Sequence, residues 1–426
     1  MPKNIFVLGL DDENRRTFED LPDAEQLRFH PLLSVDELLR GEIRLAELLD
    51  QAEEQLDSFD GTVDAIVGYW DFPVSSMVPI LCRHRGLPSA SLEAVLKCEH
   101  KYWSRLEQRK SIEEHPRFAL VHLDDEAAPD NLRYPMWIKP VKAFSSELAF
   151  LVEDEQQFRN ALGEIRAGIG RVGSPFDFAL SHIELPPEIA EVGGQACLAE
   201  ESVSGHQVTV EGYHDGETIH VYGVIDSYNY EESPSFQRYQ YPSKLPESVI
   251  ERLIGVSKRI IGHIGLHSVF NIEYFWNDDD DTIHLLEINP RHSQSHAMLF
   301  EQVDGVPNHH CMVELALGHT PHMPHRQGPY AVGAKWFHRR FSRDATVRRS
   351  PTSEEVAAIE RDIPGVHVEI AVNRGDRLSD LSGQDSYSYN LAVIHVGAHT
   401  EEELTDKYER CVQALAFEFD DHGVDE

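Results

Sequence analysis

The stretch IHLLEINPRHSQSH, residues 283–296, places an acid, an amide and a base at every second position of an apolar run. Successive side chains of a β-strand point to opposite faces, so Glu287, Asn289 and Arg291 would share one face of a strand. The apolar neighbours predict that this strand is buried. A buried face that carries an acid and an amide in line is a candidate cation site.

The preceding apolar run, SVFNIEYFW, carries Asn271 and Glu273 at the same spacing. If the connecting turn is centred on Asp280, Glu273 lies opposite Glu287 or within one register step of it. Directly opposed carboxylates repel each other, and buried carboxylates need a cation. Ligands that are all oxygen predict a hard ion, and Mg²⁺ takes one or two carboxylates together with phosphate oxygens. Mn²⁺ is the alternative ion, and a solvated sheet face with incidental acids is the alternative interpretation.

A cluster of lysines indicates where phosphate would be held. Four of the ten lysines fall within 46 residues: Lys97, Lys101, Lys139 and Lys142. Lys139 ends the strand-like YPMWIKP and precedes a loop that contains Ser145 and Ser146. A strand that delivers a lysine into a Ser-rich turn can place an ammonium group and backbone N–H groups against phosphate oxygens.

The third candidate element is LAEESVSGHQVTVEGY, residues 198–213, in which two strand-like runs meet at Ser204 and Gly205. Such a hinge offers backbone donors and acceptors to the edge of an adenine ring. Glu200 could accept the adenine amino group.

Taken in order, KYWSR, YPMWIKPV, LAEESVSGHQVTVEG, FNIEYF and LLEINPR resemble the ordered motifs of the ATP-grasp superfamily. The resemblance covers about residues 95–320 and is to the L-amino acid ligase or carboxylate–amine ligase type, which is related to biotin carboxylase and D-alanine:D-alanine ligase. It implies an ATP-grasp fold behind an N-terminal Rossmann-like domain, with ATP and Mg²⁺ as cofactors.

The resemblance also implies roles for individual residues. Lys101 and Lys139 would contact the nucleotide phosphates, Glu273, Glu287 and Asn289 would bind Mg²⁺, and Lys139 and Arg291 would serve catalysis. Further contacts to ATP would come from Ser145, Ser146, Glu200, Glu201, Val203, Gln207 and Glu211. The chain departs from the family pattern at Gln207, where many relatives have a glutamate, and in the loop after Lys139, where relatives usually carry glycines.

Ligases of this family activate a carboxylate as an acyl phosphate, which an amine then attacks. The resemblance therefore implies a ligase that acts on a small-molecule carboxylate and an amine. Arg238 and His296 are candidate substrate contacts, although a surface loop and a structural histidine explain them equally well. A biotin-carboxylase-like enzyme is an alternative, but Ser295 stands near the position of its glutamate base. A nucleotide-binding protein without turnover is the second alternative.

The composition limits the possible partners. A net charge of −36 argues against nucleic acid, whose phosphates need a basic face. A dispersed acidic surface with few lysines resembles proteins from saline habitats, and an ordinary acidic cytosolic protein is the alternative. No run of 18 apolar residues predicts a membrane span, and the N-terminus does not have the shape of a signal peptide. We expect a cytoplasmic protein.

At 426 residues the chain exceeds one ordinary core, and its patterns predict an α/β and α+β multidomain protein. We expect a doubly wound α/β domain over residues 1–114, an ATP-grasp lid over 115–197, and a C-terminal subdomain over 198–426 with an α+β extension from about residue 330. Residues 34–56 have helical spacing throughout. Five scattered cysteines predict no disulfide framework. Relatives often dimerise, so a homodimer is an alternative to a monomer.

Overall fold

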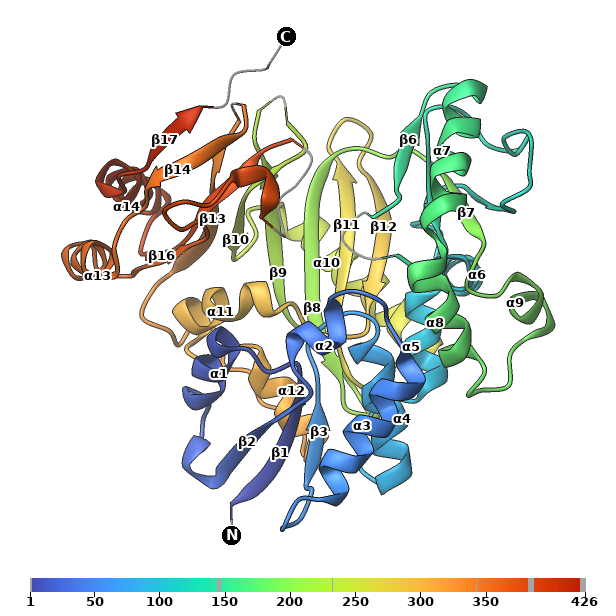
Figure 1. Cartoon of the computed structure of the whole chain (residues 1–426), viewed down its shortest axis with the longest axis horizontal. Coiled ribbons are helices and arrows are strands. Elements are labelled where there is room, and N and C mark those ends of the chain that lie inside the picture. The colour runs from blue at the N-terminus through green and yellow to red at the C-terminus, as the bar shows by residue number, and fades with distance from the viewer. Residues whose placement is uncertain (1, 144–146, 232, 342, 382–386, 422–426) are drawn as a thin grey trace.

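The N-terminal part of the computed structural model is a parallel sheet of three strands in the order β2-β1-β3 (Figure 1). The structure describes residues 2–143, 147–231, 233–341, 343–381 and 387–421. The first strands and helices are β1 (Lys3–Leu8), α1 (Asp12–Glu19), β2 (Leu27–Leu32), α2 (Val35–Leu39), α3 (Leu45–Asp57) and β3 (Ala65–Val67). The apolar centre of β1 is buried, as expected for a parallel strand covered on both faces.

The single helix predicted over residues 34–56 is wrong. Ser34 and Glu37 form a reciprocal capping box that begins α2, but this helix ends at Leu39. Gly41 then adopts a φ of +75°, which a right-handed helix cannot contain. The helical spacing continues into α3 only because both helices turn an apolar face to the same core.

Three further helices lead from the parallel sheet to the rest of the molecule: α4 (Val74–Arg85), α5 (Leu92–Glu99) and α6 (Lys101–Ser111). The His100 ring caps α6 by accepting a hydrogen bond from the backbone N–H of Trp103 at 3.2 Å. Helix α6 therefore begins at Lys101, one of the predicted phosphate contacts.

The next part is the small sheet, four antiparallel strands in the order β4-β7-β5-β6. Its strands are β4 (Phe118–Val121), β5 (Met136–Pro140), β6 (Phe150–Val152) and β7 (Cys197–Glu201), and its helices are α7 (Glu155–Gly168), α8 (Gly170–Leu180) and α9 (Pro187–Val192). The predicted boundary between residues 197 and 198 falls inside β7. The domain limits otherwise stay predictions.

The large sheet contains eight antiparallel strands in the order β12-β11-β8-β9-β10-β13-β16-β15. Its first strands are β8 (His206–His214), β9 (Ile219–Asn229), β10 (Phe236–Tyr241), β11 (Val269–Asn277) and β12 (Thr282–Asn289). Helix α10 (Glu247–Ile264) covers one face with an apolar stripe that includes Leu253, Ile260 and Ile261. The hairpin predicted around Asp280, β11–β12, is confirmed, and β8 and β9 form a second hairpin.

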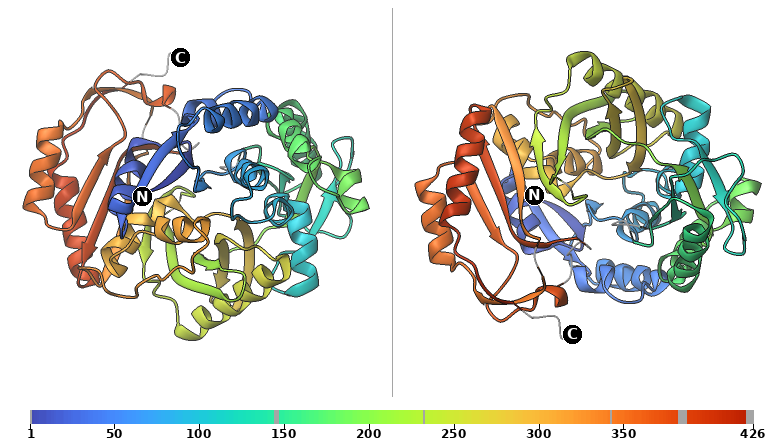
Figure 2. Two further views of the ribbon diagram at one scale, coloured as in Figure 1. Left: turned by 90° about the horizontal axis from the view of Figure 1, so that it is seen from below. Right: turned by 90° about the horizontal axis from the view of Figure 1, so that it is seen from above.

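The C-terminal segment adds β13 (Val332–Arg340), β15 (Val366–Ile370) and β16 (Tyr389–Ala398) to the far edge of the large sheet. The remaining elements are α11 (Ala297–Asp304), α12 (His309–Ala316), β14 (Ala345–Arg349), α13 (Ser353–Asp362), α14 (Glu401–Ala414) and β17 (Glu418–Asp421). Both views in Figure 2 place these C-terminal strands and the small sheet at opposite ends of the molecule. The C-terminal extension therefore continues the central sheet.

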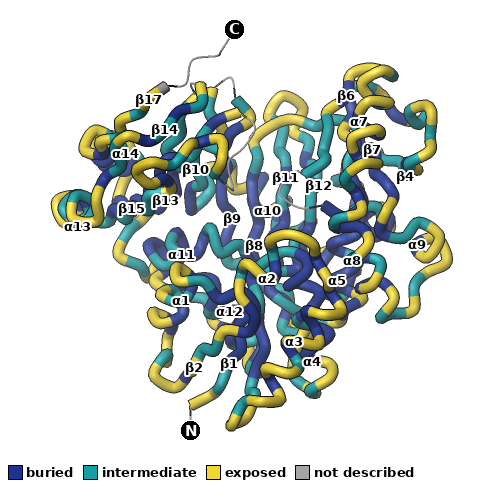
Figure 3. The backbone as a smooth tube through the Cα atoms, viewed as in Figure 1, coloured by how far each residue is buried: buried dark blue, intermediate teal, exposed yellow. Residues whose placement is uncertain are grey.

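Buried residues concentrate in the central strands, whereas exposed residues lie on the outer helices and turns (Figure 3). All five cysteines are buried and free, which agrees with the absence of a predicted disulfide framework. Within the described ranges, no helix has the length and apolarity that crossing a bilayer requires. The mixed α/β and α+β character predicted from the sequence is confirmed.

Candidate active site

A cavity of about 690 Å³ lies between the small sheet and the large sheet. Fourteen of the residues singled out by the sequence line it: Lys101, Lys139, Lys142, Glu200, Glu201, Val203, Gln207, Asn271, Glu273, Glu287, Asn289, Arg291, Ser295 and His296. Glu211 and Arg238 do not line it. Ser145 and Ser146 lie outside the described residues. Motifs separated by almost 200 residues therefore meet in one cavity.

The acid pair lies where strand pairing predicted it. Glu273 of β11 is the direct register partner of Glu287 of β12, and Asn271 is the partner of Asn289. Burial and the neighbouring Glu287 raise the pKa of Glu273 to about 7. The Nδ2 atom of Asn289 lies 3.5 Å from Glu273 Oε1 and donates to Asn271 Oδ1 at 3.2 Å. The predicted register is therefore confirmed.

The donor set fits a magnesium ion that also binds phosphate. The described residues contain no metal-binding group of three or more His, Cys, Asp or Glu side chains. Glu273, Glu287 and Asn289 would supply two carboxylates and an amide, and Mg²⁺ usually completes such a set with phosphate oxygens and water. The pKa of Glu273 is raised by burial and by the negative charge of Glu287, and a bound cation would neutralise that charge.

Two lysines face these acids from the opposite side. Lys101 forms an ion pair with Glu287, and its Nζ also donates to the carbonyl oxygen of Ala143 at 3.1 Å. Although burial opposes ionisation of Glu287, Lys101 lowers the pKa of this carboxyl group. The second lysine, Lys139 at the end of β5, pairs with Glu200 on the neighbouring strand β7. Both ammonium groups are thus fixed at the cavity wall.

Glu200 holds Lys139 in place rather than presenting a free carboxylate. One oxygen pairs with Lys139 and the other with Arg105, whose side chain is only 2% exposed. Burial opposes ionisation, but the two cations hold the pKa of Glu200 at about 2. Both oxygens of Glu200 have a cation partner while the side chain still lines the cavity, and its contact with the adenine amino group stays a prediction.

Arg105 connects the small sheet to the edge strand of the large sheet. Its Nη1 donates to the carbonyl oxygen of Leu285 at 3.0 Å, and its Nη2 donates to that of Leu286 at 2.7 Å. These carbonyl groups lie where the β11–β12 register shifts, directly before Glu287 in the chain. A bulge on an edge strand leaves backbone groups unpaired. Arg105 satisfies them and so fixes the strand that carries Glu287.

Arg291 lies at the end of the cavity nearest the N-terminal part. Its Nε and Nη2 donate to the two oxygens of Asp71, at 2.7 and 2.9 Å, and its Nη1 donates to the carbonyl oxygen of His292 at 3.1 Å. Burial opposes ionisation of Asp71, but Arg291 lowers its pKa. Asp71 also lines the cavity. Its place between β3 and α4 gave no signal in the sequence.

Glu211 is fully buried beneath the cavity floor and accepts hydrogen bonds from five donors. They are Asn271 Nδ2, Tyr222 Oη, Asn308 Nδ2, His296 Nδ1 and the backbone N–H of Ser293. Its predicted direct contact with ATP needs correction, because the carboxylate is enclosed by these donors. Glu211 instead orients His296, whose Nδ1 lies 2.7 Å away.

The prediction that Arg238 contacts substrate is also wrong, because Arg238 does not line the cavity. The Arg238 guanidinium packs over the rings of Tyr228 and Trp336, at 4.7 and 5.1 Å from their centroids. The adjacent residue, Tyr239, points to the other side of β10, lines the cavity and meets His296 edge to face. Strand alternation explains the difference, because neighbouring residues of a strand face opposite ways.

The other predicted ATP contacts lie on the cavity wall. Glu201 accepts a hydrogen bond from the backbone N–H of Arg133, and Gln207 Nε2 donates to Glu273 Oε2 at 3.3 Å. Val203 lies between them in the hinge that joins β7 to β8. Their contacts with adenine and ribose stay predictions.

The segment that contains most of these motifs matches a known domain family. The sequence profile of the ATP-grasp domain matches residues 132–297. The chain contains an ATP-grasp domain. The matched range runs from the strand that carries Lys139 to the loop after Arg291, and the resemblance inferred from the motifs is thereby confirmed. Gln207, Glu273, Glu287 and Asn289 all fall inside it.

The ATP-grasp fold also extends beyond the matched range. An L-amino acid ligase from Bacillus licheniformis superposes with a TM-score of 0.72 over 98% of this chain and 99% of its own, at 16% identity. Phosphoribosylglycinamide synthetase from Anaerococcus prevotii superposes with a TM-score of 0.68 over 99% and 100%, at 14% identity. Identities this low establish a shared fold only.

A curated relative is the carbamoyl phosphate synthase large chain of Clostridium acetobutylicum, 24% identical over 225 residues. The match covers 50% of this chain and 20% of that protein. About half of this chain therefore matches about a fifth of the length of this much larger relative.

Proposed function

We propose that this ATP-grasp protein is an ATP-dependent ligase that activates a carboxylate as an acyl phosphate and joins it to an amine, releasing ADP and phosphate. The observation that carries the proposal is the meeting, in one cavity, of the Glu273–Glu287 pair with Lys101, Lys139 and Arg291. Phosphoryl transfer needs positioned positive charge, and these groups supply it around a site for a divalent ion.

Each side chain has a separate task in this reaction. Bound Mg²⁺ would neutralise charge on the transferring phosphoryl group, and Glu273, Glu287 and Asn289 would hold it. Lys101 and Lys139 would bind phosphate oxygens, with Glu200 and Arg105 fixing the position of Lys139. Arg291 would stabilise the substrate carboxylate and the oxyanion that forms when the amine attacks.

The position of Arg291 supports this role. Asp71 engages two of its nitrogens, and the whole group is held rigidly at the cavity wall. A preorganised guanidinium does not have to be ordered during the reaction, which is the main advantage of an enzyme site over water. The small sheet covers the other side of the cavity and would exclude water, which would otherwise hydrolyse an acyl phosphate.

We further propose that the carboxylate belongs to an amino acid. The cavity wall around Tyr239 combines an aromatic ring with His296, Ser293 and Ser295, which suits a small polar substrate. The superposition with an L-amino acid ligase over almost the whole of both chains supports the same substrate class.

A carboxylase is less well supported by the cavity. The residue near the position of the glutamate base is Ser295, whose Oγ lies 3.4 Å from Lys335 Nζ. A serine beside a lysine does not provide a carboxylate base. A nucleotide-binding protein without turnover would have no need for Arg291 at the wall opposite the lysines.

The test is phosphate release with Mg²⁺ and ATP across a panel of amino acids and other carboxylic acids, singly and in pairs, at low and high salt. The expected result is release that requires one acid and one amine and that disappears in Glu287→Gln. Release that requires bicarbonate would favour the carboxylase. ATP binding without release from any mixture would favour the non-catalytic protein.

A further inference from the structure

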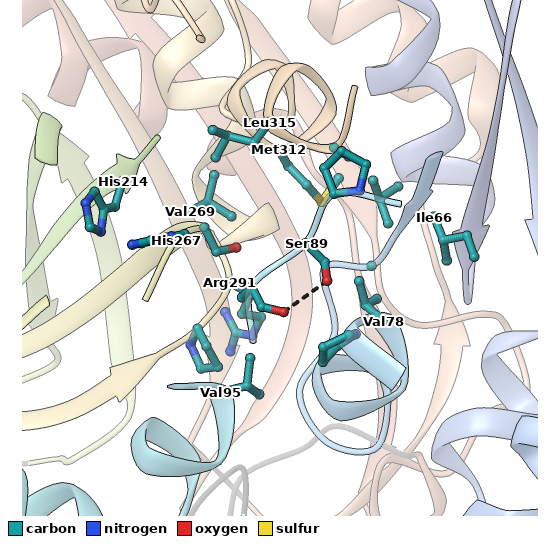
Figure 4. A pocket seen from close by; sticks show the side chains of 18 of the residues that line it. Ile66, Val78, Ser89, Val95, His214, His267, Val269, Arg291, Met312 and Leu315 are labelled. Carbon is teal, nitrogen blue, oxygen red and sulfur yellow. Dashed lines mark hydrogen bonds between the residues drawn. The ribbon is translucent and has the colours of Figure 1, made fainter. Parts of the chain in front are cut away.

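A second cavity, of about 280 Å³, is also lined by Arg291, and Figure 4 shows it from close by. Its walls come from β3, α4, the segment before α5, the β8–β9 turn, the start of β11 and α12. Among the described residues, Arg291 alone lines both cavities. The small cavity thus has its own walls and is separate from the site proposed for ATP and the ligase substrates.

The inner part of the small cavity is apolar. Figure 4 shows Ile66, Val78, Val95, Val269, Met312 and Leu315 around it. Protein interiors are usually packed without voids larger than a water molecule. An apolar hollow of roughly 150 Å³ in another protein stays dry and binds benzene. A hollow of about 280 Å³ has room for an aromatic ring and a short polar chain.

One side of the small cavity carries hydrogen-bond acceptors. His214 Nδ1 must donate to the carbonyl oxygen of Leu266, 3.1 Å away, and burial lowers the pKa of this histidine. The neutral ring then presents Nε2 as an acceptor, and no described residue bonds to that atom. Next to it, Asp215 accepts two backbone hydrogen bonds, from Glu217 and Thr218, which lower its pKa and keep it ionised.

Few positive groups lie near these acceptors: His220 Nε2 is 3.8 Å from Asp215 Oδ2 and carries charge only when it is protonated. Arg291 is the only lysine or arginine that lines the small cavity among the described residues, and its Nε, Nη1 and Nη2 already donate to Asp71 and to the carbonyl oxygen of His292. The ring of His267 lies against that of His214, with centroids 4.4 Å apart, and is exposed to solvent. The side that includes Ser89, His267 and His319 is exposed, so a ligand can reach the cavity from solvent.

We propose that the small cavity is a binding site for a small aromatic or aliphatic amine, with its apolar body among Val78, Val269 and Met312 and its ammonium group at Asp215 and His214. The charge of the rim selects an amine over a carboxylate of the same shape. The site does not depend on the ligase reaction, so its failure would leave the proposed function untouched.

The test is calorimetric titration of the full-length protein with 2-phenylethylamine, beside 3-phenylpropionate, which has the same ring and an opposite charge. We expect saturable binding of the amine and at least tenfold weaker binding of the acid. Val78→Phe, which fills the cavity, should weaken amine binding at least tenfold. Val356→Phe, a matched change of a half-buried helical valine on α13, should leave it unchanged.

Further variants separate the small cavity from the large one. Asp215→Asn keeps an oxygen for the turn but removes the charge, and should weaken amine binding about tenfold. Tyr239→Ala, in the large cavity, should have no effect. Unchanged ATP affinity in Val78→Phe would show that this variant folds. Equal binding of the amine and the acid, equal binding by Val78→Phe and Val356→Phe, loss of binding in Tyr239→Ala, or no saturable binding would each overturn the proposal.

Discussion

On the small-sheet wall of the large cavity, Glu200 binds two cations, Arg105 and Lys139. On the large-sheet wall, Glu273 and Glu287 face each other, and only Glu287 has a cation, Lys101. The pKa of Glu200 is about 2, whereas that of Glu273 is about 7. Two glutamates of one cavity thus differ in pKa by about five units because their surroundings differ.

This difference indicates that the small-sheet wall stabilises the fold, whereas the large-sheet wall is suited to bind a ligand. The small-sheet wall is electrostatically complete, so removing Arg105, which also binds two backbone carbonyl groups, should cost stability. The large-sheet wall holds negative charge that the protein does not neutralise, so removing one acid should cost function and spare the metal-free fold.

The largest effect should come from Arg105→Met. It leaves Glu200 with one partner and the Leu285 and Leu286 carbonyl groups unpaired, and breaking such a buried pair costs about 3–5 kcal/mol. Denaturant unfolding of the metal-free protein would measure the loss. Arg252→Met breaks an exposed pair with Asp281 and should cost less than about 1 kcal/mol. Similar losses in both variants would contradict the distinction between the walls.

Lys139→Met should lower the rate of phosphate release by about 10²–10³, the usual cost of removing one preorganised charge from a transition state. Its stability should change little, because Glu200 keeps Arg105. The comparison with Lys110→Met, at an exposed lysine paired with Glu107, isolates the effect of position. A large loss of stability in Lys139→Met together with full activity would reverse the roles assigned to the two cations.

Metal binding should depend on the proton at Glu273. The folded-state pKa of about 7 lies above the ordinary 4.5 of glutamate. This proton therefore stabilises the metal-free fold, fully below about pH 4.5, and the contribution is lost as the pH rises through about 7. Because Mg²⁺ displaces the proton, its affinity should fall about tenfold for each pH unit below 7.

Glu273→Gln sharpens this prediction. The variant should bind Mg²⁺ weakly at every pH, and its metal-free form should unfold at a higher temperature than the wild type at pH 8. Titration of Mg²⁺ followed by calorimetry at pH 6, 7 and 8, together with thermal unfolding, would check both effects. An affinity that is independent of pH in the wild type would show that Glu273 is not a ligand.

The smallest effect should separate two neighbours on β10. Tyr239→Ala should raise KM for the carboxylate or the amine about tenfold, because its ring lines the large cavity beside His296. Arg238→Met should leave KM unchanged and lower only stability, because its guanidinium packs on Trp336. Steady-state phosphate release at varied substrate would distinguish them, and a larger KM change in Arg238→Met would contradict the placement of the cavity wall.

The large-sheet wall could be predicted from the sequence because its two acids are close to each other in the chain. Glu273 and Glu287 are brought together by one hairpin, and strand alternation with a turn centre fixes the register. The ordered motifs then identified the ATP-grasp fold.

The features that the sequence did not predict depend on contacts between segments far apart in the chain or on single backbone angles. Nothing in the residues around Asp71 predicts that it meets Arg291, 220 positions away. The partners of Glu200 and Glu211 come from other elements, so the sequence does not indicate these ion pairs and hydrogen bonds. Choosing between Arg238 and Tyr239 as the cavity residue requires knowing which face of β10 each one occupies. The end of α2 before Gly41 depends on the positive φ of this glycine.

The most direct test of the central claim follows an oxygen atom. A carboxylic acid substrate labelled with ¹⁸O in its carboxylate would be turned over with Mg²⁺, ATP and the amine, and the released phosphate would be analysed by mass spectrometry. The acyl phosphate route predicts one ¹⁸O atom transferred to phosphate for each amide formed. Phosphate that carries no ¹⁸O, released while the amide accumulates, would contradict it.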